Sequence, residues 1–127
     1  MYTFQISTGK LSHNGALLGT GWAGHDAGRN NVDMQNVPDI GPLPCGKYKI
    51  GKAYHHPKLG PFTMDLTPDP ANEMYGRSLF RMHGAAADNP ATPINEFLES
   101  SHGCIIQMRP VREKVDEGSD RDLEVVE

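Results

Sequence analysis

Apolar and polar residues alternate along much of the chain, and this pattern predicts short strands rather than long helices. Tyr2, Phe4 and Ile6 show the alternation near the N-terminus. Other segments share it and are predicted strands: GKYKIG (46–51), PFTMDL (61–66, with Phe62, Met64 and Leu66 on one face), SLFRMHG (78–84) and DLEVV (122–126). In SLFRMHG the period places Leu79, Arg81 and His83 on one face, and Phe80 and Met82 on the other.

Turn and helix signals separate these strands. Asn14-Gly15 favours a two-residue hairpin turn between a strand starting near Lys10 and one running over 16–21. Residues 24–44 are rich in Gly, Asn and Pro without any period, so they predict a long loop of the kind that often carries function. Two short helices are expected, over Thr92–Glu99, with Thr92 as N-cap, and from Pro110 to about Glu117.

These elements favour a mainly β fold, a sandwich or partly open barrel with one or two short helices. The 127 residues suit one domain spanning residues 1–127, and 14 Gly and 10 Pro fit many turns. The net charge of −4 comes from the segment that starts at Arg112, and the rest is balanced, so we expect no nucleic-acid partner.

The sequence also bears on location and cofactors. The stretch MYTFQISTGK has neither a basic nor an apolar region, so we expect synthesis in the cytoplasm without a standard signal peptide. No apolar run approaches the roughly 18 residues of a membrane span. Cys45 and Cys104 are too few for a disulfide framework and lack the paired spacing of a structural zinc site. No metal or cofactor is expected.

Cys104 is the candidate nucleophile, although a lone cysteine is more often a small buried side chain. Gly103 allows the backbone to approach a carbonyl, so amides near Cys104 could form an oxyanion hole, and Ile105-Ile106 predict a strand that holds the turn. A thiol needs a base, and His83 ends a predicted strand before Gly84. His102 is assigned a structural or pocket-lining role, because adjacent side chains on an extended chain point in opposite directions.

The combined spacing of these residues resembles the signature of the YkuD-type L,D-transpeptidases, cysteine acyltransferases of bacterial peptidoglycan. The matching residues are His83-Gly84, then a loop, then Ser101-His102-Gly103-Cys104-Ile105, together with the strand LPCGKYKI (43–50). Segments such as STGKLSHNG and NVPDIGPLP look closer still to the small, signal-less L,D-transpeptidase-like toxins delivered by type VI secretion. The resemblance covers roughly residues 5–125.

The resemblance implies a YkuD-like β fold and a covalent mechanism on peptidoglycan stem peptides. Cys104 would be the nucleophile and His83 the base, with the backbone of Gly103 and Cys104 as oxyanion hole and Ser101, His102 and Gly84 in support. Water or an amine would then resolve the thioester, giving L,D-carboxypeptidase or L,D-transpeptidase activity, including D-amino-acid exchange. The toxin branch further implies action in the periplasm of a target bacterium, and an immunity protein as a partner.

One departure from the family concerns substrate binding. Many relatives carry an arginine two residues after the nucleophile, where this chain has Ile106. Arg81, which shares the predicted face of His83, and Arg109 are the candidates to replace it, and Arg81 is favoured.

Other interpretations remain open at this point. Two rival functions are a zinc hydrolase using His83, His102 and Cys104, and an inactive cell-wall-binding module. Several residues are assigned from local context alone: His13, His55 and His56 to the surface, Cys45 to the core, His25 to a cleft or the surface, and Trp22 and Tyr75 to packing or a groove wall.

Overall fold

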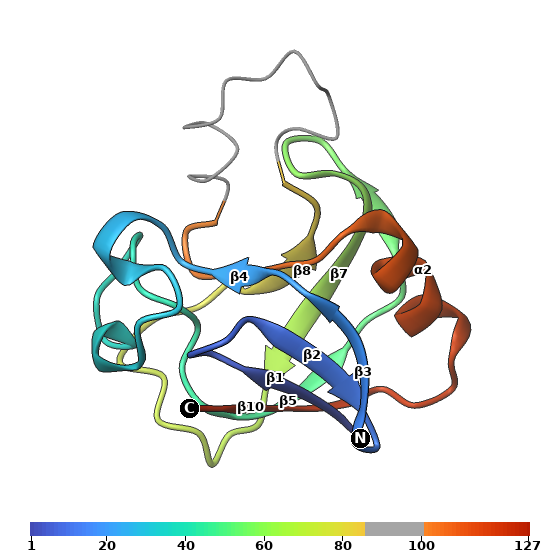
Figure 1. Cartoon of the computed structure of the whole chain (residues 1–127). Coiled ribbons are helices and arrows are strands. Elements are labelled where there is room, and N and C mark those ends of the chain that lie inside the picture. The colour runs from blue at the N-terminus through green and yellow to red at the C-terminus, as the bar shows by residue number, and fades with distance from the viewer. Residues whose placement is uncertain (86–100) are drawn as a thin grey trace.

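The computed structural model describes residues 1–85 and 101–127, and its fold is mainly β, as the sequence predicts (Figure 1). The strands are β1 (Tyr2–Gln5), β2 (Lys10–His13), β3 (Ala16–Thr20), β4 (Trp22–Ala23), β5 (Gly46–Ile50), β6 (Tyr54–His56), β7 (Gly60–Pro68), β8 (Arg81–His83), β9 (Ile105–Ile106) and β10 (Asp122–Val126). The helical elements of the described ranges are the short 3-10 helices η1 (Asp26–Gly28) and η2 (Val32–Met34) and the α-helix α2 (Arg109–Glu117).

The sheet curls into a nearly closed barrel. Its strand order is β3-β2-β1-β10-β5-β7-β8-β9-β4, with β6 added to β7. Strands β3 and β4 stand at opposite ends of this order, yet only Gly21 separates them along the chain, so the two edges of the sheet must meet. A Cβ on Gly21 would lie 1.7 Å from the Ile106 carbonyl oxygen, so this meeting point requires glycine.

The middle of the sheet joins the two ends of the described chain. β1 pairs in parallel with β10, with Tyr2 opposite Leu123 and Phe4 opposite Val125, and β10 pairs antiparallel with β5. These residues are buried in a core shared by most of the strands. Helix α2 adds its fully buried Val115 to that core, and it begins with Pro110 in its first turn, where the missing N–H costs nothing.

Several expectations about elements are confirmed. The hairpin turns at Asn14-Gly15, both with positive φ, and α2 spans the predicted helix with Arg109 added at its start. The long loop over 24–44 holds only η1 and η2. The helix expected over 92–99 lies outside the described residues. No helix in the described part of the chain is long and apolar enough to cross a membrane.

Other strand boundaries were predicted wrongly. Residues 54–56, which were not predicted as a strand, form β6 against β7. β8 is shorter than the predicted strand because Leu79 has a φ of +65°. Phe62 has a φ of +55°, which interrupts the alternation inside β7. As a result Thr63 is buried beside Met64, and Phe62 does not share the core face of Met64 and Leu66.

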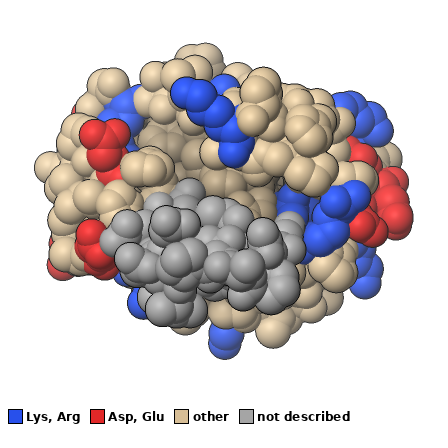
Figure 2. All heavy atoms as spheres, turned by 90° about the horizontal axis from the view of Figure 1, so that it is seen from above, with Lys and Arg blue, Asp and Glu red and all other residues tan. Residues whose placement is uncertain are grey.

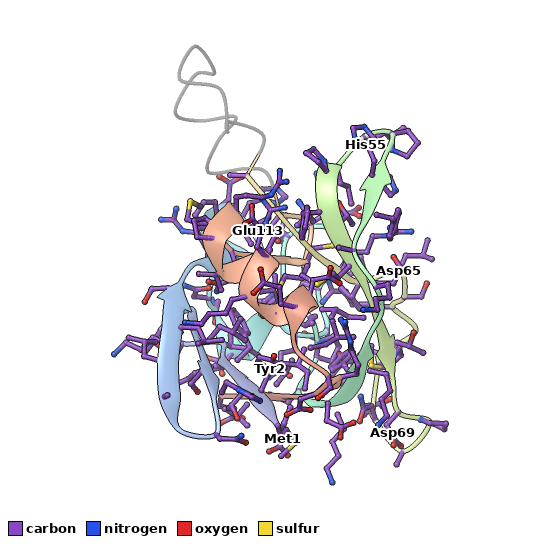
Figure 3. All side chains as sticks on the ribbon, turned by 90° about the vertical axis from the view of Figure 1, so that its right-hand side faces the viewer. Met1, Tyr2, His55, Asp65, Asp69 and Glu113 are labelled. Carbon is purple, nitrogen blue, oxygen red and sulfur yellow. The ribbon has the colours of Figure 1, made fainter. Side chains whose placement is uncertain are left out.

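The strands that carry the candidate residues lie side by side on one wall of the barrel. β8 pairs antiparallel with β7 and in parallel with β9, which follows Cys104 directly. The β6–β7 hairpin projects beyond this wall with His55 at its outer end, and α2 packs across the barrel beside it (Figure 3). In the segment 78–84, which includes β8, the predicted alternation holds at Phe80 and Met82, whose side chains are buried in the core.

Candidate active site

Ser101 fixes the turn that leads into Cys104. The side chain is fully buried, and its Oγ accepts the Gly24 N–H at 2.8 Å and the Gly103 N–H at 3.1 Å. The same hydroxyl donates to the Cys104 carbonyl oxygen at 2.5 Å. We call residues Ser101–Cys104 the Cys104 turn, and Ser101 ties both of its ends to one point.

Gly103 gives the Cys104 turn its shape. Its φ of +123° is one that side chains rarely adopt, and a Cβ would lie 2.7 Å from both an Arg77 guanidinium nitrogen and the Phe80 ring. The Gly103 carbonyl oxygen accepts the Leu43 N–H at 3.0 Å. Gly103 therefore allows a close approach to Arg77 and Phe80, while the approach of its backbone to a substrate carbonyl stays a prediction.

Cys104 is half-buried at the start of the parallel β8–β9 pair. Its Sγ accepts the Arg81 backbone N–H at 3.3 Å. Burial raises the pKa of the Cys104 thiol, while that hydrogen bond and the charges of Arg81 and Arg77 act in the opposite direction. The resting side chain is therefore a neutral thiol at pH 7, and it needs a base to react.

His83 lies two residues after Arg81 on β8, on the strand next to Cys104. It is 2% exposed, and its Nδ1 is 2.7 Å from the Gly84 carbonyl oxygen. Because a carbonyl can only accept, Nδ1 carries the proton and Nε2 is left as the acceptor. Burial lowers the pKa of His83 to about 4, the Gly84 hydrogen bond opposes this shift, and the positive charge of Arg112 adds to it. His83 is thus a neutral imidazole at pH 7.

The two candidate arginines have different surroundings. The Nε of Arg81 lies 3.0 Å from a carboxylate oxygen of Asp65, its partner across β7–β8, and 3.2 Å from the Tyr54 hydroxyl. Arg109 pairs with Glu113 one turn along α2 at 2.8 Å, and its guanidinium lies 4.3 Å from the centre of the Phe62 ring. Arg81 is the one whose own backbone touches the Cys104 sulfur.

His102 and His25 meet beside the Cys104 turn. His102 is exposed, and its ring centre is 5.0 Å from that of His25 in an edge-to-face arrangement. His25 Nδ1 lies 2.8 Å from the Ser101 carbonyl oxygen. His102 and Tyr75 both line a shallow pocket of about 210 Å³. Trp22 lies in β4, paired with β9.

Residues assigned from local context fall mainly where expected. His55 is exposed, His13 and His56 are partly exposed, and Cys45 is half-buried and packs against the core. A larger depression of about 560 Å³ lies over β5, β7 and β10 and contains none of the candidate residues, so its size does not mark the site. Within residues 1–85 and 101–127, no group of three or more His, Cys, Asp or Glu side chains could hold a metal ion.

Sequence reasoning missed two buried or half-buried arginines beside the site. Arg112 is 1% exposed, and its guanidinium donates to the carbonyl oxygens of Gln107, Pro61 and Phe62 at 2.9 Å each. Arg77 donates to carbonyls of the 24–44 loop and of the Cys104 turn. The available signal was weak: Arg112 lies three residues before Val115 on the buried side of α2, whereas nothing in the sequence marks Arg77.

Comparison with known families decides the wider assignment. The family model named Tlde1 domain matches residues 19–124. The chain belongs to the Tlde1 domain family. Tlde1 domains are a family of type VI secretion effectors, in agreement with the expected antibacterial toxin. This family match does not by itself support the more specific resemblance to YkuD-type L,D-transpeptidases. No curated protein and no solved structure matches the chain.

Proposed function

We propose that this Tlde1 domain is a cysteine acyltransferase or peptidase that acts on peptidoglycan stem peptides. The observation that carries the proposal is the register of β8 and β9, which sets the Cys104 sulfur against the Arg81 backbone, two residues from the buried, neutral His83. A thiol and an acceptor imidazole on adjacent strands are the parts that nucleophilic acyl transfer requires.

In the proposed first step, His83 Nε2 removes the Cys104 proton as Sγ attacks the carbonyl carbon of an L,D-peptide bond. The C–N bond then breaks, His83 returns the proton to the leaving amine, and the acyl group remains as a thioester. Water or a D-amino acid resolves the thioester, giving hydrolysis or exchange. Because the pKa of Cys104 is raised and that of His83 lowered, the proton moves during the attack and not before it.

The oxyanion of the tetrahedral intermediate needs a donor within the Cys104 turn. The Gly103 N–H is bonded to Ser101 Oγ, whereas among the described residues the Cys104 N–H bonds only within its own residue, to Sγ, so of the two amides expected to serve we assign the Cys104 N–H. The Gly103 carbonyl belongs to the same peptide unit and is held by Leu43. The donor is therefore fixed before any substrate binds.

Arg81 is our candidate for the group that binds a substrate carboxylate. A guanidinium can hold a carboxylate through two parallel hydrogen bonds, which lysine cannot reproduce. Contacts with Asp65 and Tyr54 run through Nε and hold the side chain in one orientation. Seen from above, on the side toward which the β6–β7 hairpin rises, the surface is hollowed and Lys and Arg side chains stand beside the hollow (Figure 2). An anionic peptide would meet positive charge there.

As a type VI effector domain, the protein is expected to reach its target inside another cell. We propose that it acts in the periplasm, where removal or exchange of the terminal D-alanine would deprive cross-linking of its donor stems. An immunity protein is the partner that this role requires in the producing cell.

The test is mass spectrometry of purified muropeptides incubated with wild type, Cys104→Ala and the matched control Cys45→Ala. Loss of terminal D-alanine, or its replacement by an added D-amino acid, is expected for wild type and Cys45→Ala. The rate for Cys104→Ala should fall by several orders of magnitude, because the nucleophile is gone. Wild-type rates from Cys104→Ala would remove the cysteine mechanism, and loss of activity with a chelator would favour the zinc alternative.

A further inference from the structure

Arg77 joins the long loop to the Cys104 turn. One terminal nitrogen donates to the carbonyl oxygens of Gln35 and Pro42, both at 2.7 Å. The other donates to Gly41 at 2.9 Å and reaches the His102 carbonyl at 3.4 Å. Three of these carbonyls belong to the loop over 24–44, and the fourth belongs to the turn that carries the nucleophile.

The Arg77 side chain is also held from below. Its guanidinium carbon lies 5.0 Å from the centre of the Phe80 ring. The same guanidinium and the same ring form the surface on which Gly103 rests. Burial lowers the pKa of Arg77, but a guanidinium is so basic that the side chain stays charged at pH 7.

The contacts of Arg77 lead to the backbone of Cys104 in one further step. Pro42, which accepts from Arg77, is followed by Leu43, whose N–H donates to the Gly103 carbonyl oxygen at 3.0 Å. That carbonyl and the Cys104 N–H lie in one planar peptide unit and point in opposite directions. Fixing the carbonyl therefore fixes the direction of the Cys104 N–H, and the hydrogen bond also polarises it.

We propose that Arg77 is a positioning residue for the oxyanion donor, acting through Pro42, Leu43 and the Gly103–Cys104 peptide. The role of the Cys104 N–H as oxyanion donor rests on the proposed acyl-transfer function. The role of Arg77 in holding the loop and the Cys104 turn rests on the contacts alone. Lysine cannot replace Arg77, because an ammonium on a single stem cannot span four carbonyls from two segments.

The test compares Arg77→Lys with wild type and with the control Arg121→Lys. Arg121 is also half-buried and also donates to backbone carbonyls, those of Asp116 and Gly51, but it lies between α2 and β10, away from the Cys104 turn. Both lysine variants keep the positive charge, so charge alone does not separate them. Thermal unfolding checks that each variant is folded.

Three measurements separate positioning from a general structural role. Hydrogen exchange of the Leu43 amide should be at least tenfold faster in Arg77→Lys and unchanged in Arg121→Lys. The rate constant kcat for acyl transfer should fall about ten- to a hundredfold, toward the loss seen when an oxyanion donor is removed, with KM changing less than kcat. Alkylation of Cys104 by iodoacetamide should keep its rate, since displacement at a saturated carbon forms no oxyanion.

Each alternative result overturns a stated part. A wild-type rate of hydrogen exchange at the Leu43 amide in Arg77→Lys would show that Arg77 does not hold the loop. An equal loss in alkylation and acyl transfer would show that Arg77 acts on the thiol and not on the donor. If the wild type transfers no acyl group, the proposed function fails. The hydrogen-exchange rate of the Leu43 amide still decides whether Arg77 holds the loop in place.

Discussion

Two residues beside Cys104 show how much a single position determines at this site. Gly103 supplies a backbone angle and a lack of volume that let Arg77 and Phe80 pack beneath the turn. His83 supplies a nitrogen that can accept a proton, because burial keeps its ring neutral and the Gly84 carbonyl orients it. The backbone conformation at Gly103 and the neutral state of His83 both depend on the surrounding residues as well as on the residue type. One substitution at each position tests them.

Gly103→Ala is expected to lower both stability and acyl transfer. Its φ of +123° and the two 2.7 Å approaches of a Cβ to Arg77 and Phe80 should cost about 1–3 kcal/mol. The same displacement shifts the Cys104 N–H, so turnover should fall more than the folded fraction does. Denaturant unfolding and muropeptide turnover measure the two effects, and an unchanged unfolding midpoint would contradict the described geometry.

The buried His83 makes stability depend on pH in a defined window. In the unfolded chain this histidine gains its proton near pH 6.5, but in the folded protein only near pH 4. The unfolded state therefore binds more protons between these values, and stability falls as the pH drops from about 6.5 to 4, by about 3 kcal/mol in all. Below pH 4 the His83 contribution no longer changes.

The measurement is the free energy of unfolding against pH for wild type and His83→Gln. The difference between the two free energies of unfolding should change with pH only between about pH 6.5 and pH 4, and it should stay constant below pH 4. His55→Gln, at the exposed outer end of the β6–β7 hairpin, is the matched substitution and should keep the wild-type slope. Parallel curves for wild type and His83→Gln would mean that His83 is not buried as a neutral ring.

At the level of elements, closure of the sheet depends on backbone contacts around Gly21. Its N–H donates to the Gly9 carbonyl at 2.8 Å, and its α-carbon lies against the Ile106 carbonyl. Ile106 follows Cys104 by two residues in β9 and faces Trp22 across the β4–β9 pair. β9, the strand that directly follows Cys104, is thus paired along its outer edge with β4 because the chain turns so tightly at Gly21.

Gly21→Ala should therefore prevent β4 from pairing with β9. The added Cβ would lie 1.7 Å from backbone, which no side-chain rotation relieves, so we expect a loss of at least about 2–3 kcal/mol. Gly51→Ala is the control, because a Cβ there meets its nearest atom at an ordinary 3.6 Å. Denaturant midpoints compare the variants, and equal midpoints would argue against closure at this point.

The sequence predicted elements well wherever the local pattern was itself the cause. Asn14-Gly15 forms its turn, and Pro110 marks the start of α2, because both act through their own backbone. Phe62 and Leu79 broke the predicted alternation because each adopts a positive φ, a feature that neither residue type favours. Such angles are imposed by the tertiary structure, so the alternation of apolar and polar residues along the sequence does not reveal them.

The candidate site divides in the same way. Ser101, Gly103 and Cys104 could be identified because they are contiguous, and His83 because it ends a strand before a glycine. Arg77 could not, because its importance lies in carbonyl groups up to 42 residues away, and every residue type supplies a carbonyl. Ile106 in place of the expected arginine is fully buried, so that position could not carry a charge here without a partner.

At the level of the whole molecule, the protein is an effector domain whose proposed substrate lies outside the cytoplasmic membrane. Expression without a signal peptide should therefore leave a Gram-negative host unharmed, while fusion to an export signal should make it toxic. Export-fused Cys104→Ala is the control and should be harmless at the same protein level. Growth curves and viable counts measure the effect, and equal toxicity in the two compartments would contradict the peptidoglycan proposal.

The parallel pairing of β1 with β10 has a consequence for how the protein comes into being. On the ribosome β1 emerges first, yet its neighbour in the finished sheet is β10, which also lies between β1 and β5. Until residue 126 has left the exit tunnel, the N-terminal hairpin and the β5–β7 portion have no strand to join them. The wall that bears His83 and Cys104 is then unsupported, so a nascent chain has no assembled site. The candidate site is therefore expected to assemble only once β10 is available to pair with both β1 and β5.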